Sequence, residues 1–123
     1  MVLFSFSFCA IINNTVKNIM EVRFLDNALE QFIRGLEKPT IAKVLRTIDL
    51  LESFGSQLGM PHSKKIVSRL FELRVRGRQE VRILYTFHNG GAVLLHGFIK
   101  KSQKIATKEL KVAYQKLRAL DSL

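Results

Sequence analysis

The sequence predicts an α+β domain in which an antiparallel β-sheet packs against an N-terminal helical hairpin and is followed by a C-terminal helix. Two segments with apolar residues at helical spacing lie on either side of Pro39. Three segments of alternating apolar and polar residues follow a stretch rich in Gly, Ser and Pro at residues 55–63. A last amphipathic segment ends the chain, so the predicted order is β-α-α-β-β-β-α.

The N-terminal half is predicted to form one short strand and both helices of the hairpin. The expected elements are a strand at Val22–Leu25 and helices at about Ala28–Glu37 and Thr40–Ser53. Asp26 or Asn27 can cap the first helix, because both side chains accept hydrogen bonds from free backbone amides. Pro39 suits the first turn of the second helix, and Gly55 can end that helix in a left-handed conformation.

The C-terminal half is predicted to form a three-stranded meander and a helix. The expected elements are strands at Leu70–Arg76, Glu80–His88 and Ala92–Lys100 and a helix at about Ala106–Leu120. The Asn89-Gly90-Gly91 sequence favours a hairpin turn, because these residues accept positive φ. Tyr85 alternates with apolar residues, so it is expected in the core with its hydroxyl hydrogen-bonded.

The net charge of +10 lies entirely in the second half of the chain. Residues 1–61 carry six Lys/Arg and six Asp/Glu, whereas residues 62–123 carry fourteen Lys/Arg and four Asp/Glu. Such asymmetry favours a polyanionic partner, with nucleic acid ahead of an acidic protein. The alternative is a solubilising surface, in which both signs of charge would be interspersed.

The N-terminal segment is interpreted as an extension or a misassigned start at residues 1–19, followed by one domain at residues 20–123. An extra strand in this segment is the alternative. Its apolar run, Val2–Ile12, is shorter than the about 20 residues that a membrane span requires. It also lacks the basic start and cleavage site of a signal peptide. The single cysteine, Cys9, cannot form a disulfide within the chain, which fits a cytoplasmic protein.

Three arginines are the leading candidates for a functional site. Arg74 and Arg76 project from one side of their predicted strand, and Arg82 follows on the next strand of the hairpin. If the register is regular, all three guanidinium groups share one face. Arginine suits phosphate because its planar fork donates paired hydrogen bonds and keeps its charge. The alternative is pairing with Glu72 or Glu80 inside the fold.

Lysines and histidines supply further candidates around the predicted sheet. The basic residues near the ends of the sheet are His62, Lys64, Lys65, Lys100, Lys101 and Lys104. Lys108 adds a further basic group from the predicted last helix. The alternative for these residues is ordinary solvation. His96 shares the polar side of its strand and can transfer protons near neutral pH, or it can be structural or stack on RNA. The histidine spacing predicts no metal site.

Three stretches of the chain together resemble one family. They are LLESFGSQLGMPHSKKI (Leu50–Ile66), LFELRVRGRQEVRILY (Leu70–Tyr85) and VLLHGFIKKSQK (Val93–Lys104). They are similar to the RelE/ParE toxins of type II toxin–antitoxin systems, and most of all to the phage-derived HigB-like branch. The resemblance covers about residues 21–120.

The resemblance implies a RelE-like fold with two N-terminal helices, a small sheet and one C-terminal helix. It also implies a helix-turn-helix antitoxin as partner, with DNA contacted only through the antitoxin complex, and no membrane association. The implied activity is endonucleolytic cleavage of mRNA on the ribosome without a metal or cofactor, which inhibits translation. The alternative is a ParE-like inhibitor that binds DNA gyrase and cleaves nothing.

Carried onto this chain, the resemblance and the charge pattern divide the candidate residues into two groups. The catalytic candidates are Arg74, Arg76, Arg82, His96 and Lys100. The RNA-binding candidates are His62, Lys64, Lys65, Lys101, Lys104 and Lys108. The chain departs from the family pattern at Glu72, where RelE-type enzymes have lysine, and at Ile105-Ala106, where relatives have Thr-Pro. The final helix also lacks an early tyrosine, so the general base remains open.

Overall fold

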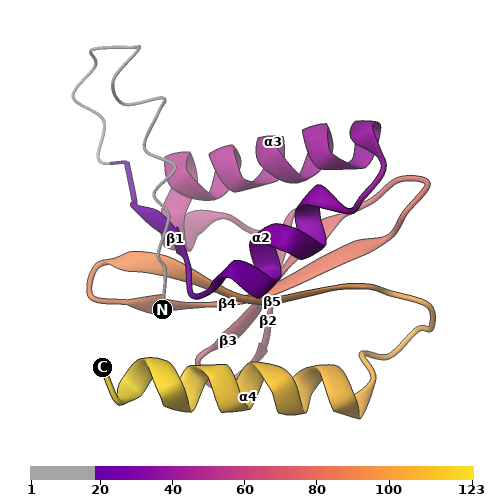
Figure 1. The fold of residues 1–123 in the computed structure, drawn as a ribbon. Coiled ribbons are helices and arrows are strands. Elements are labelled where there is room, and N and C mark those ends of the chain that lie inside the picture. Colours follow the sequence, from indigo (N-terminus) through magenta and orange to yellow (C-terminus); the bar gives the residue numbers. More distant parts are fainter. Residues whose placement is uncertain (1–18) are drawn as a thin grey trace.

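The computed structural model describes residues 19–123, so most of the predicted extension, with Cys9, lies outside the described residues. The elements are β1 (Val22–Phe24), α2 (Asn27–Arg34), α3 (Lys38–Phe54), the short 3₁₀ helix η1 (Gly55–Gln57), β2 (Ser63–Val67), β3 (Leu70–Val75), β4 (Val81–His88), β5 (Gly91–Ile99) and α4 (Thr107–Asp121). They form three layers, with α2 and α3 on one face of the sheet and α4 on the other (Figure 1). The predicted α+β class is confirmed.

The sheet has five strands in the order β1-β5-β4-β3-β2 and is mixed. β1 runs parallel to β5, while all other neighbours are antiparallel. The prediction of a purely antiparallel sheet is therefore wrong at this edge. The alternation of side chains within β1 predicts a strand but carries no information about its partner, and here the partner is the last strand of the chain.

The strand β2 was not predicted, which corrects the element order to β-α-α-β-β-β-β-α. It pairs with β3, with Ser63 opposite Leu73. Ser63 is buried and its hydroxyl is hydrogen-bonded to the Tyr85 hydroxyl. The inward position is thus polar, and the pairing register shifts between Lys65 and Val67. Because of both features, β2 lacks the alternation of apolar and polar residues that predicts a strand from sequence.

The helical hairpin forms as its end signals predict, with small shifts of its bounds. The Asp26 side chain accepts a hydrogen bond from the Leu29 amide and caps α2. The second helix begins at Lys38 and contains Pro39 in its first turn, where no intrahelical amide is lost. Gly55 ends it with a φ of +55°.

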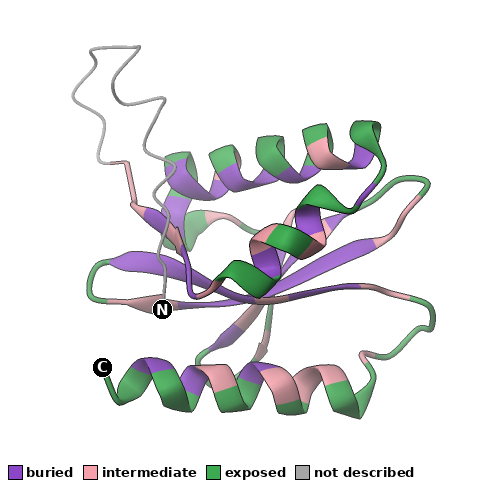
Figure 2. Cartoon of the chain, in the orientation of Figure 1, coloured by how far each residue is buried: buried purple, intermediate pink, exposed green. Residues whose placement is uncertain are grey.

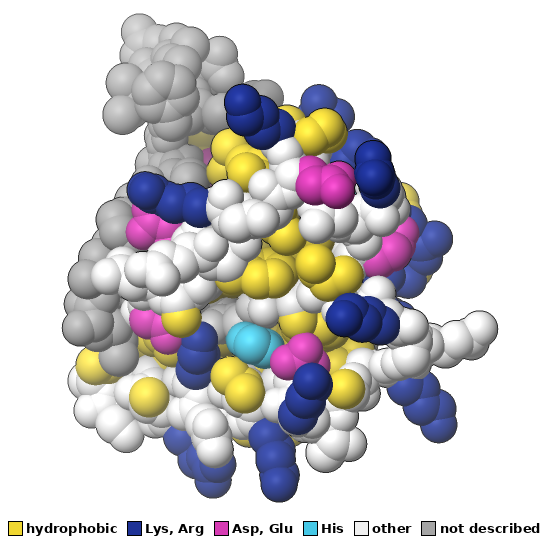
Figure 3. Space-filling view, turned by 45° about the vertical axis from the view of Figure 1, so that its right-hand side comes forward, with side chains coloured by type: hydrophobic (Ala, Val, Ile, Leu, Met, Phe, Trp, Pro, Cys, Tyr) yellow, Lys and Arg dark blue, Asp and Glu magenta, His cyan; other side chains and the backbone are white. Residues whose placement is uncertain are grey.

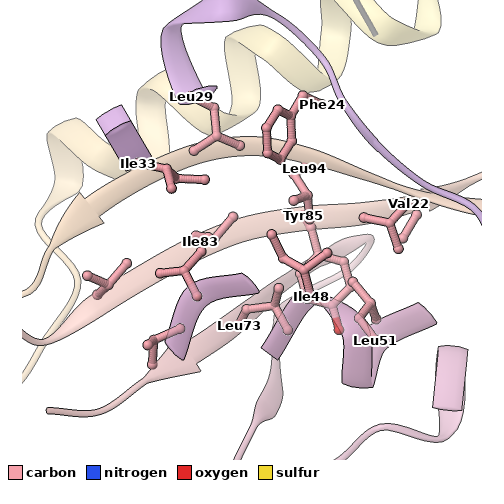
Figure 4. Close-up of a cluster of buried hydrophobic side chains, with 14 of the residues drawn as sticks. Val22, Phe24, Leu29, Ile33, Ile48, Leu51, Leu73, Ile83, Tyr85 and Leu94 are labelled. Carbon is pink, nitrogen blue, oxygen red and sulfur yellow. The ribbon is translucent and has the colours of Figure 1, made fainter. Parts of the chain in front are cut away.

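The larger core lies between the helical hairpin and the sheet, and Figure 4 shows its centre. The fully buried side chains there include Val22, Ile48, Leu51, Leu73, Ile83, Tyr85 and Leu94. Burial raises the pKa of the Tyr85 phenol, while its hydrogen bond to Ser63 acts in the opposite direction. The predicted core position of Tyr85, with a bonded hydroxyl, is confirmed.

The smaller core lies between the sheet and α4 and covers only part of that face. Its buried residues are Leu25, Leu70, Leu84, Val93, Leu95, Phe98, Ala113, Leu117 and Leu120. Figure 2 shows buried residues on the inner side of α4 and exposed ones on its outer side. The N-terminal cap of α4 is Ala106, which makes no side-chain capping bond. None of the described helices is long and apolar enough to cross a membrane.

Gly97 allows α2 to approach β5 closely. A Cβ atom at this position would lie 2.7 Å from Leu29 Cδ1 and 2.8 Å from Phe32 Cδ2. A valine at Gly97 is therefore expected to lower the free energy of unfolding by about 1–3 kcal/mol through overpacking. Gly59→Ala is the matched control, because a Cβ there meets nothing within 4 Å. Urea denaturation measures both, and equal stabilities would contradict the close approach.

Glu52 is a buried carboxyl at the end of α3, with 1% of its surface exposed. Burial raises the pKa of Glu52 from 4.5 to about 7, and the charge of Asp49 adds to the shift. The folded protein therefore binds more protons than the unfolded chain between these pH values, so this group lowers stability as pH rises from about 4.5 to about 7.

Glu52→Gln is expected to remove this pH dependence, because glutamine carries no charge to desolvate. At pH 8 the variant should be more stable than the wild type by up to about 3 kcal/mol, and near pH 4.5 the two should be nearly equal. Urea denaturation at the two pH values measures the difference. A stability gap that does not change with pH would contradict the assignment.

Candidate functional site

The register of the central strands fixes the arginines on the face of the sheet that α4 covers in part. Arg74 on β3 lies directly opposite Arg82 on β4. Arg82 in turn lies opposite Phe98, which belongs to the smaller core against α4. Because side chains alternate along a strand, Glu72 projects on the same face as Arg74. The register therefore confirms the predicted shared face for Arg74 and Arg82, while Arg76 lies just beyond the end of β3.

Arg74 and Arg82 line an open cleft of about 620 Å³, here called the arginine cleft. Its charged lining residues are Arg74, Arg76, Glu80, Arg82, Lys100 and Lys101. The two lysines follow the end of β5 and reach the cleft because the end of β3, the start of β4 and the end of β5 lie together. The cleft thus joins four of the five catalytic candidates, and five cations face one lining carboxylate.

Glu72 lies beneath the cleft and balances part of its charge. Its carboxylate is 3.6 Å from Arg74 Nε and 3.8 Å from Arg82 Nε. Glu80 Oε2 accepts a hydrogen bond from Arg82 Nη1 at 3.3 Å. The alternative of pairing inside the fold is therefore confirmed for Arg74 and Arg82, although both also line the cleft. Among residues 19–123, no carboxylate lies within 4 Å of Arg76.

Arg82 and Arg76 occupy different depths of the cleft. Only 3% of the Arg82 side chain is exposed, and its Nε is buried without a hydrogen-bond acceptor in the described part of the chain. Arg76 is exposed at the rim. The buried charge of Arg82 is largely compensated by the carboxylates of Glu72 and Glu80. The exposed guanidinium of Arg76 is free to donate hydrogen bonds to a bound anion.

His96 lies apart from the arginines, toward α4. Its register partner is Leu84, and its ring stacks on Phe98 with centroids 5.8 Å apart. Its Nε2 is hydrogen-bonded to Glu109 Oε1 at 3.0 Å, and 18% of each of these two side chains is exposed. The carboxylate holds the imidazole in one orientation, as a general base requires. His96 does not line the arginine cleft.

A second cleft of about 540 Å³, here called the loop cleft, separates α4 from the segment that follows β5. Its charged lining residues are Lys100, Lys101, Lys104, Lys108 and Glu109. Lys100 and Lys101 line both clefts, so the segment after β5 contributes cations to each of them. In Figure 3 a histidine lies beside an acidic side chain between the helical hairpin and α4, with Lys and Arg side chains around them.

The remaining predicted residues lie on β2 or directly before it, and they line neither of these two clefts. The His62 carbonyl accepts a hydrogen bond from the Arg74 amide at 2.8 Å. Lys64 is exposed and lies opposite Glu72 in the register of β2 and β3, so its side chain projects on the same face as the arginines. Lys65 pairs with Phe71 and projects on the opposite face. The sequence analysis grouped Lys64 with Lys65 because it did not predict β2. Within that strand, successive side chains project on opposite faces.

Glu109 is the site residue that sequence reasoning missed. It lies in the first turn of α4, where an acidic residue is ordinarily explained by the helix dipole. No spacing in the sequence connects it to His96, because the contact depends on how α4 docks against β5. Within the described residues, no group of three or more His, Cys, Asp or Glu side chains is arranged to hold a metal ion.

Comparison with protein families identifies a relationship for most of the chain. A family model described as "Phage derived protein Gp49-like (DUF891)" matches residues 31–118. The matched range includes both clefts and the His96–Glu109 pair. A search of curated proteins finds no match.

Proposed function

Because the chain belongs to the phage-derived Gp49-like family, which is part of the RelE/toxin-like group, we propose that it is the toxin of a type II toxin–antitoxin module. We propose further that it is an endoribonuclease that cleaves mRNA on the ribosome in the cytoplasm and so inhibits translation. The observation that carries this proposal is the arginine cleft. Five cations from three segments of the chain face one open space, and a phosphate backbone is the ligand that such a space suits.

The reaction would be a transesterification within the RNA. The ribose 2′-oxygen forms a bond to the adjacent phosphorus, the bond from phosphorus to the 5′-oxygen breaks, and the products are a cyclic phosphate and a 5′-hydroxyl. The pentacovalent transition state carries more negative charge than the starting phosphate. Arg76, Arg74 and Lys100 would stabilise that charge from the walls of the cleft, with Arg82 beneath them.

Proton transfer is assigned to His96, which is a proposal of its own. The 2′-hydroxyl must lose a proton and the departing 5′-oxygen must gain one. Glu109 orients the imidazole, and His96 lies diagonally across from Arg82 on neighbouring strands. Because the side chain does not line the arginine cleft, the ribosome would have to guide the RNA toward it. Orientation of the substrate by the ribosome would then supply part of the rate.

The family also indicates an antitoxin partner, and a helix-turn-helix antitoxin is the type we propose. A positively charged toxin of this kind is neutralised most directly by a partner that covers its basic clefts. DNA would then be contacted through the antitoxin of the complex rather than by this chain.

Induction of the protein in growing cells tests the proposed function. The expected result is arrest of translation within minutes and accumulation of cut messages, without DNA damage. A ParE-like gyrase inhibitor would give the reverse pattern, with DNA damage and intact messages. That reverse pattern would overturn the nuclease assignment, and induction of the Arg76→Ala variant serves as the control.

A further inference from the structure

A third cleft, here called the α3 cleft, lies on the other side of Arg74 and Arg76. It measures about 270 Å³ and lies between α3 and the segment that leads into β2. Its basic lining residues are Lys43, Arg46, His62, Arg74 and Arg76, and its remaining lining residues are uncharged. Lys43 and Arg46 come from the half of the chain with no net charge, so the charge pattern of the sequence did not indicate them.

Lys43 is held in position over the end of β3. Its Nζ donates a hydrogen bond to the Arg76 carbonyl at 3.4 Å. Gly77 has no Cβ atom, and one added there would lie only 2.7 Å from Lys43 Nζ. The ammonium group therefore contacts the turn between β3 and β4. Arg46 is three residues further along α3, on the same side of the helix. Two cations of one helix therefore stand beside the arginines of the sheet.

Three of the cations that line the α3 cleft have no carboxylate partner among residues 19–123. In the described part of the chain, no carboxylate lies within 4 Å of Lys43, Arg46 or Arg76. Arg74 is the exception, because its Nε lies 3.6 Å from the Glu72 carboxylate, which does not line the α3 cleft. A site with four strong cations and no acid in its lining favours a polyanion.

We propose that the α3 cleft binds phosphates of the same RNA strand that occupies the arginine cleft, so that the strand crosses the wall formed by Arg74 and Arg76. This inference rests on the proposed function. Both clefts are open to solvent and share these two arginines as a common wall. A chain of regularly spaced phosphates can use both sides of such a wall, whereas a single small anion would fill only one side. Lys43 and Arg46 would contact the RNA outside the bond that is cut.

The test is the salt dependence of binding to a fluorescently labelled, single-stranded 12-nucleotide RNA. Each phosphate contact on a single strand adds about 0.7 to the slope of log Kd against log salt concentration. The variant Lys43→Gln/Arg46→Gln is expected to lower the slope by about 1.4, and Arg46→Gln alone by about 0.7. The control Lys111→Gln/Arg118→Gln removes the same charge from α4, away from these clefts, and should leave the slope unchanged. Thermal unfolding checks that all variants fold.

The outcomes separate this inference from the proposed function. An unchanged slope in the α3 variant, with normal RNA binding by the wild type, would overturn the RNA path alone and leave an acidic protein segment as the ligand of the α3 cleft. An equal loss in the control would also overturn it, because the effect would then follow net charge. If the wild type neither binds the labelled RNA nor cleaves mRNA on ribosomes, the proposed RNA path and the proposed function are both overturned.

Discussion

Replacement of Arg82 by leucine is expected to lower the free energy of unfolding by about 3 kcal/mol or more, because it leaves the Glu72 carboxylate buried with less compensation. Both side chains are almost fully buried, and the Arg82 guanidinium is the link between Glu72 and Glu80. Arg74 stays beside Glu72, which places the cost at the low end of the range for broken buried pairs. Urea denaturation of the purified variant measures the loss.

A second substitution separates this electrostatic cause from lost packing. Glu72→Gln combined with Arg82→Leu removes the buried charge and is expected to recover most of the lost stability. If the double variant is no more stable than Arg82→Leu alone, the carboxylate is not the cause. Because Arg82 variants are expected to unfold more easily, their activity can be compared with that of the wild type only at equal amounts of folded protein.

The largest effect on activity at unchanged stability is expected from Arg76→Ala. Arg76 is exposed at the rim of the arginine cleft and has no carboxylate partner among residues 19–123. Its removal should lower the rate of ribosome-dependent mRNA cleavage on the order of 100-fold, as for one donor that stabilises a transition-state charge. The free energy of unfolding should change by less than about 0.5 kcal/mol. Single-turnover cleavage on programmed ribosomes measures the rate.

Arg78→Ala is the matched control for this experiment. Arg78 is two residues from Arg76 in the sequence, its side chain is 86% exposed, and its contact to Glu37 at 3.8 Å is a surface pair worth little. It does not line the arginine cleft, so its cleavage rate should stay near that of the wild type. Equal losses in the two variants would assign the effect to overall charge and not to the cleft.

The sequence predicted those elements of the fold whose own residues carry the pattern. The helical hairpin around Pro39 and the turn at Asn89–Gly91 follow from local signals, and the positive φ of Asn89 and Gly90 confirms the turn. The strand β2 could not be predicted, because its inward residue Ser63 meets a tyrosine hydroxyl that comes from a distant part of the chain. The parallel pairing of β1 with β5 has no local signal at all.

The candidate site likewise contains contacts that local sequence predicts and contacts that only the tertiary packing creates. The convergence of Arg74 and Arg82 could be predicted, because one hairpin register and the alternation of side chains determine it. The Glu109 contact to His96 could not, because it depends on the docking of α4. The approach of Lys43 to the end of β3 depends likewise on how the helical hairpin packs on the sheet. Charge counted along the chain cannot report cations that only the fold brings together.

The measurement that tests the central claim most directly is cleavage of a defined mRNA by the purified wild-type protein, with and without ribosomes, followed by identification of the new ends. The account expects cuts that depend on the ribosome, with a cyclic phosphate on one product and a 5′-hydroxyl on the other. Intact mRNA on programmed ribosomes, or products that carry a 5′-phosphate, would contradict transesterification in the arginine cleft.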